Sequence, residues 1–194
     1  MFQQPSSIQF TLPSWLEGFA QAHPFQQTVT DRMAFVIEAS QRNIEEGTGG
    51  PFAAAIFEKE SGKLVSLGVN LVTTEGLSIL HAEIVACSIA QKKLNTYDLG
   101  NTLLPTHELV TSTEPCAMCL GSIPWSGVKY VVTGATDADA RNIGFDEGAK
   151  IANWQDALRQ RGIDVVTGIH REKAARVLEH YLARQGNIYN SRNA

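Results

Sequence analysis

The order of apolar and polar positions along the 194 residues predicts a chain in which helices alternate with strands. Apolar residues recur at helical spacing from Thr28 to Glu46 and from His81 to Lys93, and a last helix is predicted from Arg171 to Arg184. Short apolar runs bounded by glycine, proline and polar residues predict five strands, at 52–57, 64–72, 107–112, 128–134 and 163–168.

This alternation predicts a layered α/β domain built on a mixed sheet. The segment from Asp137 to Asp156 is polar and interrupted by glycines, so it is predicted to be largely loop. We expect residues 1–26 to form an extension that packs on the domain through its aromatic and leucine side chains. Residues 27–185 would form the domain, and residues 186–194 a tail.

The composition indicates a globular protein, and the net charge argues against a nucleic-acid binder. The chain is 43% hydrophobic and 19% charged, which is typical of a soluble globular protein, and its length suits one domain with a full core. The net charge of −4 argues against DNA or RNA as a partner, because nucleic-acid binders usually present a basic surface.

The cysteine content and the first residues of the chain indicate the cellular compartment in which we expect the protein. Three cysteines, two of them in one short motif, do not form a disulfide framework. Metal-bound thiolates need a reducing compartment, so we expect the protein in the cytoplasm. Residues 1–25 lack the basic and apolar regions of a signal peptide, and no apolar run is long enough to cross a membrane.

Two short motifs carry the candidate chemistry. His81-Ala82-Glu83 stands at the start of one predicted helix, and Pro115-Cys116-Ala117-Met118-Cys119 at the start of another. One imidazole and two thiolates provide three zinc ligands, which leaves a fourth position open for water. Glu83, two residues from the imidazole, could then move the protons of that water. The pattern therefore predicts a catalytic zinc held by His81, Cys116 and Cys119.

Other uses of a Cys-x-x-Cys pair explain the sequence less well. A redox disulfide has no use for His-x-Glu, and a haem attachment would place histidine where Leu120 stands. A structural zinc would need a fourth protein ligand. Cys87, four residues after Glu83, is interpreted as a small buried hydrophobic residue rather than a ligand.

These motifs resemble the H-x-E…P-C-x-x-C signature of the cytidine and deoxycytidylate deaminase superfamily of zinc hydrolases. The resemblance covers about residues 28–148. Within the superfamily, four stretches look most like bacterial guanine deaminases: Gly49–Phe52, Asn70–Thr74, Glu114–Trp125 and Ala138–Glu147.

The resemblance implies a three-layer α/β/α cytidine deaminase-like fold with a mixed five-stranded sheet and one Zn²⁺ per chain. It implies hydrolytic deamination of guanine to xanthine and ammonia. Glu83 would pass a proton from water to the ring nitrogen N3 of guanine. Glu147 would supply a proton to the departing amine, with Asp146 as the nearby alternative.

Further residues are expected to bind the base. Asn70 can both donate and accept hydrogen bonds, which suits a purine edge. Phe52, Trp125 and Phe145 are candidate aromatic walls, and the backbone N–H groups of Ala82 and Cys116 could point at the reacting groups. By resemblance, the tail closes the active site and is exchanged within a homodimer, where Tyr189 would cover the neighbouring site.

The sequence also departs from the guanine deaminase pattern. Ser78-Ile79-Leu80 precedes His81, Ala117 replaces a common proline, and Glu147 stands where aspartate is expected. These differences leave the choice of substrate open to another nucleobase, a related amino-heterocycle or tRNA adenosine. A structural-zinc or RNA-binding module that kept the fold is a further alternative, and the presence of Glu83 argues against it.

Overall fold

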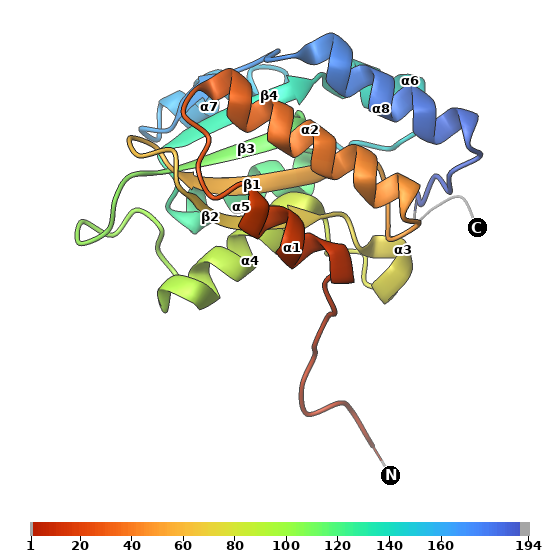
Figure 1. Cartoon of the computed structure of the whole chain (residues 1–194), viewed down its shortest axis with the longest axis horizontal. Coiled ribbons are helices and arrows are strands. Elements are labelled where there is room, and N and C mark those ends of the chain that lie inside the picture. Colours follow the sequence, from red (N-terminus) through yellow and green to blue (C-terminus); the bar gives the residue numbers. More distant parts are fainter. Residues whose placement is uncertain (1, 191–194) are drawn as a thin grey trace.

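The computed structural model describes residues 2–190, which form a five-stranded mixed sheet between two layers of helices (Figure 1). The strand order is β2-β1-β3-β4-β5. β1 is antiparallel to β2 and β3, whereas β3, β4 and β5 are parallel. The strands are β1 Ala53–Glu58, β2 Leu64–Val69, β3 His107–Thr113, β4 Tyr130–Ala135 and β5 Asp164–Val166. The expected three-layer arrangement with five strands is confirmed.

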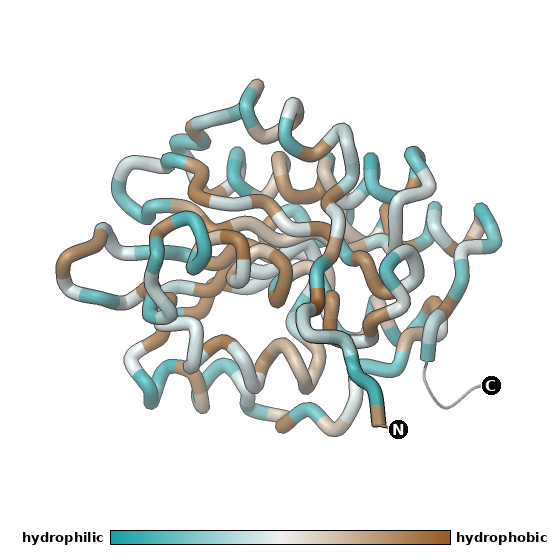
Figure 2. The backbone as a smooth tube through the Cα atoms, turned by 90° about the horizontal axis from the view of Figure 1, so that it is seen from below, coloured by the Kyte–Doolittle hydropathy of each residue, from teal (hydrophilic) through white to brown (hydrophobic). Residues whose placement is uncertain are grey.

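The helices of the described chain divide between the two faces of the sheet. The helices are α1 Ser14–Ala22, α2 Val29–Glu45, α3 Val72–Glu75, α4 Ala82–Leu94, α5 Ala117–Ser126, α6 Asp137–Asn142, α7 Trp154–Arg159 and α8 Arg171–Ala183. One apolar cluster joins α1, α2 and α8 to the sheet, and a second joins α4, α5 and α7 to its other face. Figure 2 shows the hydrophobic segments gathered in the middle of the molecule and hydrophilic loops around it.

Helix α2 is fixed to the sheet by a capping box and a buried ion pair. The side chain of Thr28 accepts from the backbone N–H of Asp31, and the Asp31 carboxylate accepts from the N–H of Thr28. Arg32 pairs with Glu108 of β3, and both side chains are almost fully buried. Lys59 also binds Glu108, at 3.0 Å. Removing one partner of such a pair typically costs about 3–5 kcal/mol, so this contact strongly favours one placement of α2.

Helix α4 lies unusually close to strand β2 because β2 contains a glycine. A Cβ atom at Gly68 would lie 2.4 Å from the backbone nitrogen of Ala86 and 2.5 Å from the carbonyl oxygen of Ala82. The hydroxyl of Ser66 donates to the carbonyl of Ala86 at 2.7 Å. The absence of a side chain at Gly68 therefore allows the first turn of α4, which follows His81, to rest directly on the sheet.

The segment from Asp137 to Asp156 is loop over residues 143–153, as predicted, but α6 forms at its start and α7 begins near its end. Thr136 caps α6 in a capping box whose third residue is Asp139. Arg171, at the start of α8, binds the Asp139 carboxylate at 2.9 Å. α7 forms because Trp154 and Leu158, one turn apart, are both buried in the core.

The N-terminal residues divide into an exposed segment and a docked helix. Residues 2–13 lie along the surface or extend away from the domain, and Phe2 and Ile8 are largely exposed (Figure 1). Trp15, Leu16 and Phe19 of α1 are buried in the core, whereas Phe25, which follows α1, is 54% exposed. None of the helices between residues 2 and 190 has the length and hydropathy required to cross a membrane.

Candidate metal centre and active site

The topology of the sheet brings distant segments together at one edge. Because β1 is antiparallel to β3, its start next to Phe52 lies at the carboxyl end of β3. Because β2 is antiparallel to β1, its end next to Asn70 lies at the same edge. The chain leaves β3 there through Glu114 and Pro115 and enters α5. Crevices at the carboxyl ends of strands are where open α/β sheets bind ligands.

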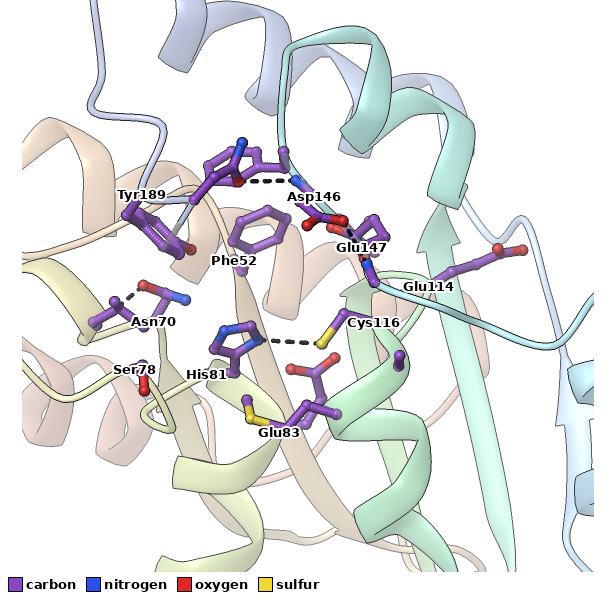
Figure 3. Close-up of a pocket in the computed structure, with 17 residues that line it drawn as sticks. Phe52, Asn70, Ser78, His81, Glu83, Glu114, Cys116, Asp146, Glu147 and Tyr189 are labelled. Carbon is purple, nitrogen blue, oxygen red and sulfur yellow. Dashed lines mark hydrogen bonds between the residues drawn. The ribbon is translucent and has the colours of Figure 1, made fainter. Parts of the chain in front are cut away.

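The three expected metal ligands meet at this edge. The ligand atoms of His81, Cys116 and Cys119 all lie within 4.8 Å of one another. His81 is the N-cap residue of α4 and Cys116 that of α5, and the Cys116 sulfur lies 3.4 Å from Nδ1 of His81 (Figure 3). The N-termini of two helices therefore present the imidazole and the sulfurs to one point, where the helix dipoles favour thiolate.

The protonation of this cluster indicates that it is built for a cation. A hydrogen bond from Cys119 and the contact with His81 lower the pKa of Cys116 to about 4. The same hydrogen bond with Cys116, together with burial, raises the pKa of Cys119 well above its usual value. Burial opposes charge on His81, yet its hydrogen bond to Cys116 raises its pKa. A divalent cation bound between the two sulfurs would favour the thiolate form of both.

Glu83 lies beside the three ligands and is buried. Its side chain is 6% exposed, and burial raises its pKa. The Thr111 hydroxyl of β3 donates to its Oε1 at 3.3 Å, and the Cys119 thiol donates to its Oε2 at 3.3 Å. Burial makes a carboxylate a stronger proton acceptor than it is in water, which is the property required of a general base.

A cavity of about 370 Å³ opens above the ligands and Glu83. The rings of Phe52 and Phe145 pack nearly edge to face in this cavity, with their centroids 5.0 Å apart. The rings of Phe145 and Tyr189 pack in the same way, also with centroids 5.0 Å apart. Figure 3 shows Phe52 and Tyr189 on the side of the cavity opposite Glu83. The cavity is thus lined by apolar rings on one side and by the ligand cluster on the other.

Asn70 is held by backbone contacts that leave its amide nitrogen free toward the cavity. Its side-chain oxygen accepts from the backbone N–H of Val72, while Nδ2 is buried and has no partner among residues 2–190. The amide of Asn43 binds the carbonyls of Gly50 and Asn70, at 2.9 Å and 3.0 Å. The hydroxyl of Tyr189 is likewise buried without a partner in the described chain. Buried polar groups without partners in a cavity point to a polar ligand.

Glu147 and Asp146 differ in where their carboxylates lie. The side chain of Glu147 is 6% exposed and lines the cavity, and burial, aided by the charge of Cys116, raises its pKa to about 8. Asp146 also lines the cavity, but its side chain is half exposed and accepts from the backbone N–H of Gly148. Of the two, Glu147 is the buried acid that faces the ligand cluster.

One expectation for the cavity does not hold. Trp125 is 85% exposed and does not line the cavity. It follows Cys119 by six residues, and six residues of helix turn through roughly 240° beyond a full turn, so it faces away from the ligand side of α5. Ala82 is the first residue of α4 and its methyl group is fully buried, and the role of its backbone N–H stays a prediction.

The sequence reading missed several residues that line the cavity: Ser78, Thr113, Glu114 and Asn190. Thr113 could have been found, because it follows Thr111 by two residues on β3 and therefore faces the same side of the sheet as the Thr111–Glu83 contact. No local sequence pattern indicates Asn190, because its side chain contacts residues that lie 44 and 46 positions earlier in the chain. Its side chain binds the backbone N–H of Asp146 at 2.9 Å and the carbonyl of Gly144 at 2.7 Å.

One protein-family model matches the part of the chain that contains this site. The model for the cytidine and deoxycytidylate deaminase zinc-binding region matches residues 27–135. This segment contains His81, Glu83, Cys116 and Cys119. The match therefore covers the whole ligand cluster and the acid beside it.

Individual relatives and solved structures agree with the family match. The chain is 40% identical to guanine deaminase of Bacillus subtilis over 104 residues, which are 54% of this chain and 62% of that relative. It is similar to a solved structure of guanine deaminase from Nitrosomonas europaea, with 42% identity, a TM-score of 0.89 and coverage of 94% of this chain and 100% of that one. A structure of the protein NE0047 in complex with 2,6-diaminopurine is 45% identical, with a TM-score of 0.87 and coverage of 95% and 97%.

The ligand cluster predicts that the zinc content depends on Cys119 and not on Cys87. Cys119→Ala should purify with far less than one zinc per chain, because two ligands bind zinc much more weakly than three. Cys87→Ala is the matched control, since Cys87 is a buried free cysteine outside the cluster, and it should keep the wild-type zinc content. Elemental analysis of the purified proteins measures this. Equal zinc in Cys119→Ala and the wild-type protein would show that the cluster is not the metal site.

Proposed function

The chain belongs to the cytidine and deoxycytidylate deaminase family, and we propose that it is a zinc-dependent aminohydrolase that converts guanine and water to xanthine and ammonia. One observation carries the proposal: the three ligands share a cavity with two buried carboxylates, Glu83 and Glu147. The likeness to guanine deaminase of Nitrosomonas europaea over 94% of the chain supports guanine as the base.

His81, Cys116 and Cys119 would hold the zinc, which when bound supplies a Lewis acid that acidifies a water molecule. Two thiolates and one neutral imidazole bring the net charge of the centre to about zero, so proton removal depends on a separate base. Glu83 is that base, because it lies beside the cluster without being one of its ligands. It takes a proton from water and delivers it to the ring nitrogen N3 of guanine, next to the carbon C2 that the water oxygen attacks.

The second carboxylate serves the leaving group. The amino group on C2 departs as ammonia when the C2–N bond breaks, and it must first receive another proton. The hydroxyl left on C2 releases its proton as the carbonyl of xanthine forms, which restores the proton donor. Burial raises the pKa of Glu147 to about 8, so this side chain is protonated near neutral pH and can donate that proton. Asp146 is less suited to this role, because its side chain is half exposed and accepts from the backbone N–H of Gly148.

The cavity walls fit a flat base with polar edges. Phe52 and Phe145 provide aromatic surface on which a purine can pack. The unpartnered Nδ2 of Asn70 and hydroxyl of Tyr189 can bind acceptors on the purine edge. Related heterocycles with the same amidine edge are included in the proposal. The NE0047 complex is consistent with this, since 2,6-diaminopurine shares the 2-amino group of guanine.

We also propose the domain division 1–26, 27–185 and 186–194, in which the tail closes the active site. Two contacts of residues 186–190 support this: Tyr189 lines the cavity of its own chain, and Asn190 is bound to the segment that carries Asp146. Exchange of the tail within a homodimer stays a prediction. A Cβ at Gly50 would lie 2.9 Å from the Tyr189 ring, so the ring packs tightly on the chain before β1. Residues 191–194 lie outside the described residues.

A homodimer in the cytoplasm completes the proposal. The outer side of α5 and the chain beyond it expose the apolar side chains of Trp125 and Ile151 beside a shallow hollow. A large exposed apolar patch marks an interaction surface, and two-fold dimers are the commonest assembly of soluble proteins. The free thiols of the ligand pair suit a reducing compartment.

Guanine turnover tests the proposed reaction. The absorbance of guanine should fall and ammonia should appear with the wild-type protein, and both should stop when a chelator removes the metal. Glu83→Gln should keep its zinc but lose turnover by a factor on the order of 10²–10⁴, because the general base is gone. Glu60→Gln, an exposed glutamate far from the cavity, is the control.

The same assay separates the alternatives. Cytosine, adenine, guanosine and tRNA are tested beside guanine, and preferential release of ammonia from any of them would replace guanine as the substrate. A zinc-loaded protein that is inert toward all of them would favour a binding module. Wild-type rates in Glu83→Gln would reject the mechanism.

Deleting residues 186–194 tests the tail. Loss of the Tyr189 ring and of the Asn190 contacts should raise the KM for guanine roughly tenfold, which corresponds to about 1.4 kcal/mol of binding. Deleting residues 2–8, which are exposed, should leave KM unchanged. An unchanged KM in the tail deletion would reject the lid.

The exposed patch on α5 predicts the assembly state. Trp125→Glu should convert a dimer to a monomer in sedimentation equilibrium, because a buried unpaired carboxylate opposes association. Leu103→Glu is the matched control, since Leu103 is 90% exposed in a different loop. A wild-type monomer, or a Trp125→Glu dimer of unchanged affinity, would contradict this interface.

A further inference from the structure

A lysine ammonium is enclosed behind the wall of the cavity. Lys150 has a side chain that is only 7% exposed, and its Nζ lies 3.2 Å from Glu114 and 3.3 Å from Asp137. The ring centroid of Trp154 is 5.2 Å from the same nitrogen. Taking an ammonium out of water costs several kcal/mol unless anions stay beside it. The arrangement therefore holds both carboxylates close to Lys150.

The two carboxylates belong to segments that flank the site. Glu114 directly precedes Pro115 and Cys116, and it also accepts from the backbone N–H of Asp137 at 3.2 Å. Asp137 begins α6 and binds Arg141, which in turn donates to the carbonyl of Gly148 at 3.0 Å. We refer to Lys150, Glu114, Asp137 and Arg141 as the Lys150 cluster. Its contacts connect the segment before α5 and the start of α6 to the segment that follows Glu147.

The carboxylate of Glu147 has no support of its own. Between residues 2 and 190, no side chain hydrogen-bonds it, so the backbone decides where it lies. The carbonyl of Glu147 accepts from the backbone N–H of Ala117, the first residue of α5, at 2.9 Å. Figure 3 shows the side chain of Glu114 directed away from Cys116, while Glu147 lies near Cys116. The position of Glu147 thus depends on how the following segment is held against α5.

We propose that Lys150 is a positioning residue for Glu147, and this rests on the proposed role of Glu147 as the proton donor to the leaving amine. The ammonium cancels the repulsion between Glu114 and Asp137 and keeps residues 145–150 against the start of α5. Without it the two carboxylates separate, and the Glu147 carboxylate moves with the backbone. Proton donation to the amine then slows, while the aromatic walls that bind the base are less affected.

The test compares Lys150→Met with Lys150→Arg. Methionine keeps an unbranched stem over Trp154 but removes the charge, so kcat for guanine should fall about tenfold or more, since a misplacement of about 1 Å can cost 10²-fold. KM should change less than about threefold, because ground-state binding is largely kept. Lys150→Arg, which keeps the charge, should restore most of kcat. Zinc content should stay at the wild-type level in both variants.

A second readout does not depend on activity. Hydrogen exchange of the Ala117 amide should become about tenfold or more faster in Lys150→Met, because this N–H is protected by the carbonyl of Glu147. Lys63→Met is the matched control, since it removes a partly exposed ion pair to Glu58 at 3.3 Å, far from the cavity. In that control neither kcat nor the exchange of Ala117 should change.

Unchanged exchange of Ala117 in Lys150→Met would overturn the proposal, whatever happens to kcat. Faster exchange with unchanged kcat would also overturn it, since the segment would then move without consequence. If Lys150→Met does not fold, Lys150→Gln, which also removes the charge and keeps both carboxylates, is judged by the same two outcomes. A wild-type protein inactive on guanine would reject the proposed function, and the exchange measurement would still decide whether Lys150 holds the segment.

Discussion

The structure depends on the meeting of two helix N-termini at one edge of the sheet. α4 can approach β2 because Gly68 has no side chain, and α5 begins where the chain leaves the carboxyl end of β3. His81 and Cys116 occupy the two N-cap positions. Imidazole and sulfurs are thereby placed within reach of one cation, in the positive field of two helix ends. A shift of either helix would separate ligands that lie 35 residues apart in the sequence.

The chemistry follows from burying two acids around that cluster. Burial raises the pKa of Glu83, and it raises the pKa of Glu147 to about 8. The two acids differ in how they are held. Glu83 lies on the first turn of α4 and receives a hydrogen bond from Thr111, whereas Glu147 sits on a loop anchored by its backbone. A rigid acid beside the cluster and a loop-borne acid would suit the two proton transfers of the proposed reaction.

The sequence predicted the elements and the ligand cluster because both depend on local patterns. The residues of His-x-Glu and Cys-x-x-Cys are close in sequence, and each motif starts a helix with a clear apolar pattern. α6 was missed because its capping box uses Asp139 in a polar segment, and α7 because its burial depends on distant partners. The sequence motif suggests Trp125 as a cavity wall, but the turn of α5 beyond Cys119 directs it away from the cavity. The Asn190 contacts and the Lys150 cluster join segments far apart in sequence, and no local pattern reports them.

X-ray absorption at the zinc edge of the purified protein tests the central claim most directly. The account predicts two sulfur ligands at about 2.3 Å and one imidazole nitrogen at about 2.0–2.1 Å, with one further light atom completing the shell. A shell without sulfur, or one completed by a third sulfur, would contradict it. In either case His81, Cys116 and Cys119 would not hold the metal with one position left for water.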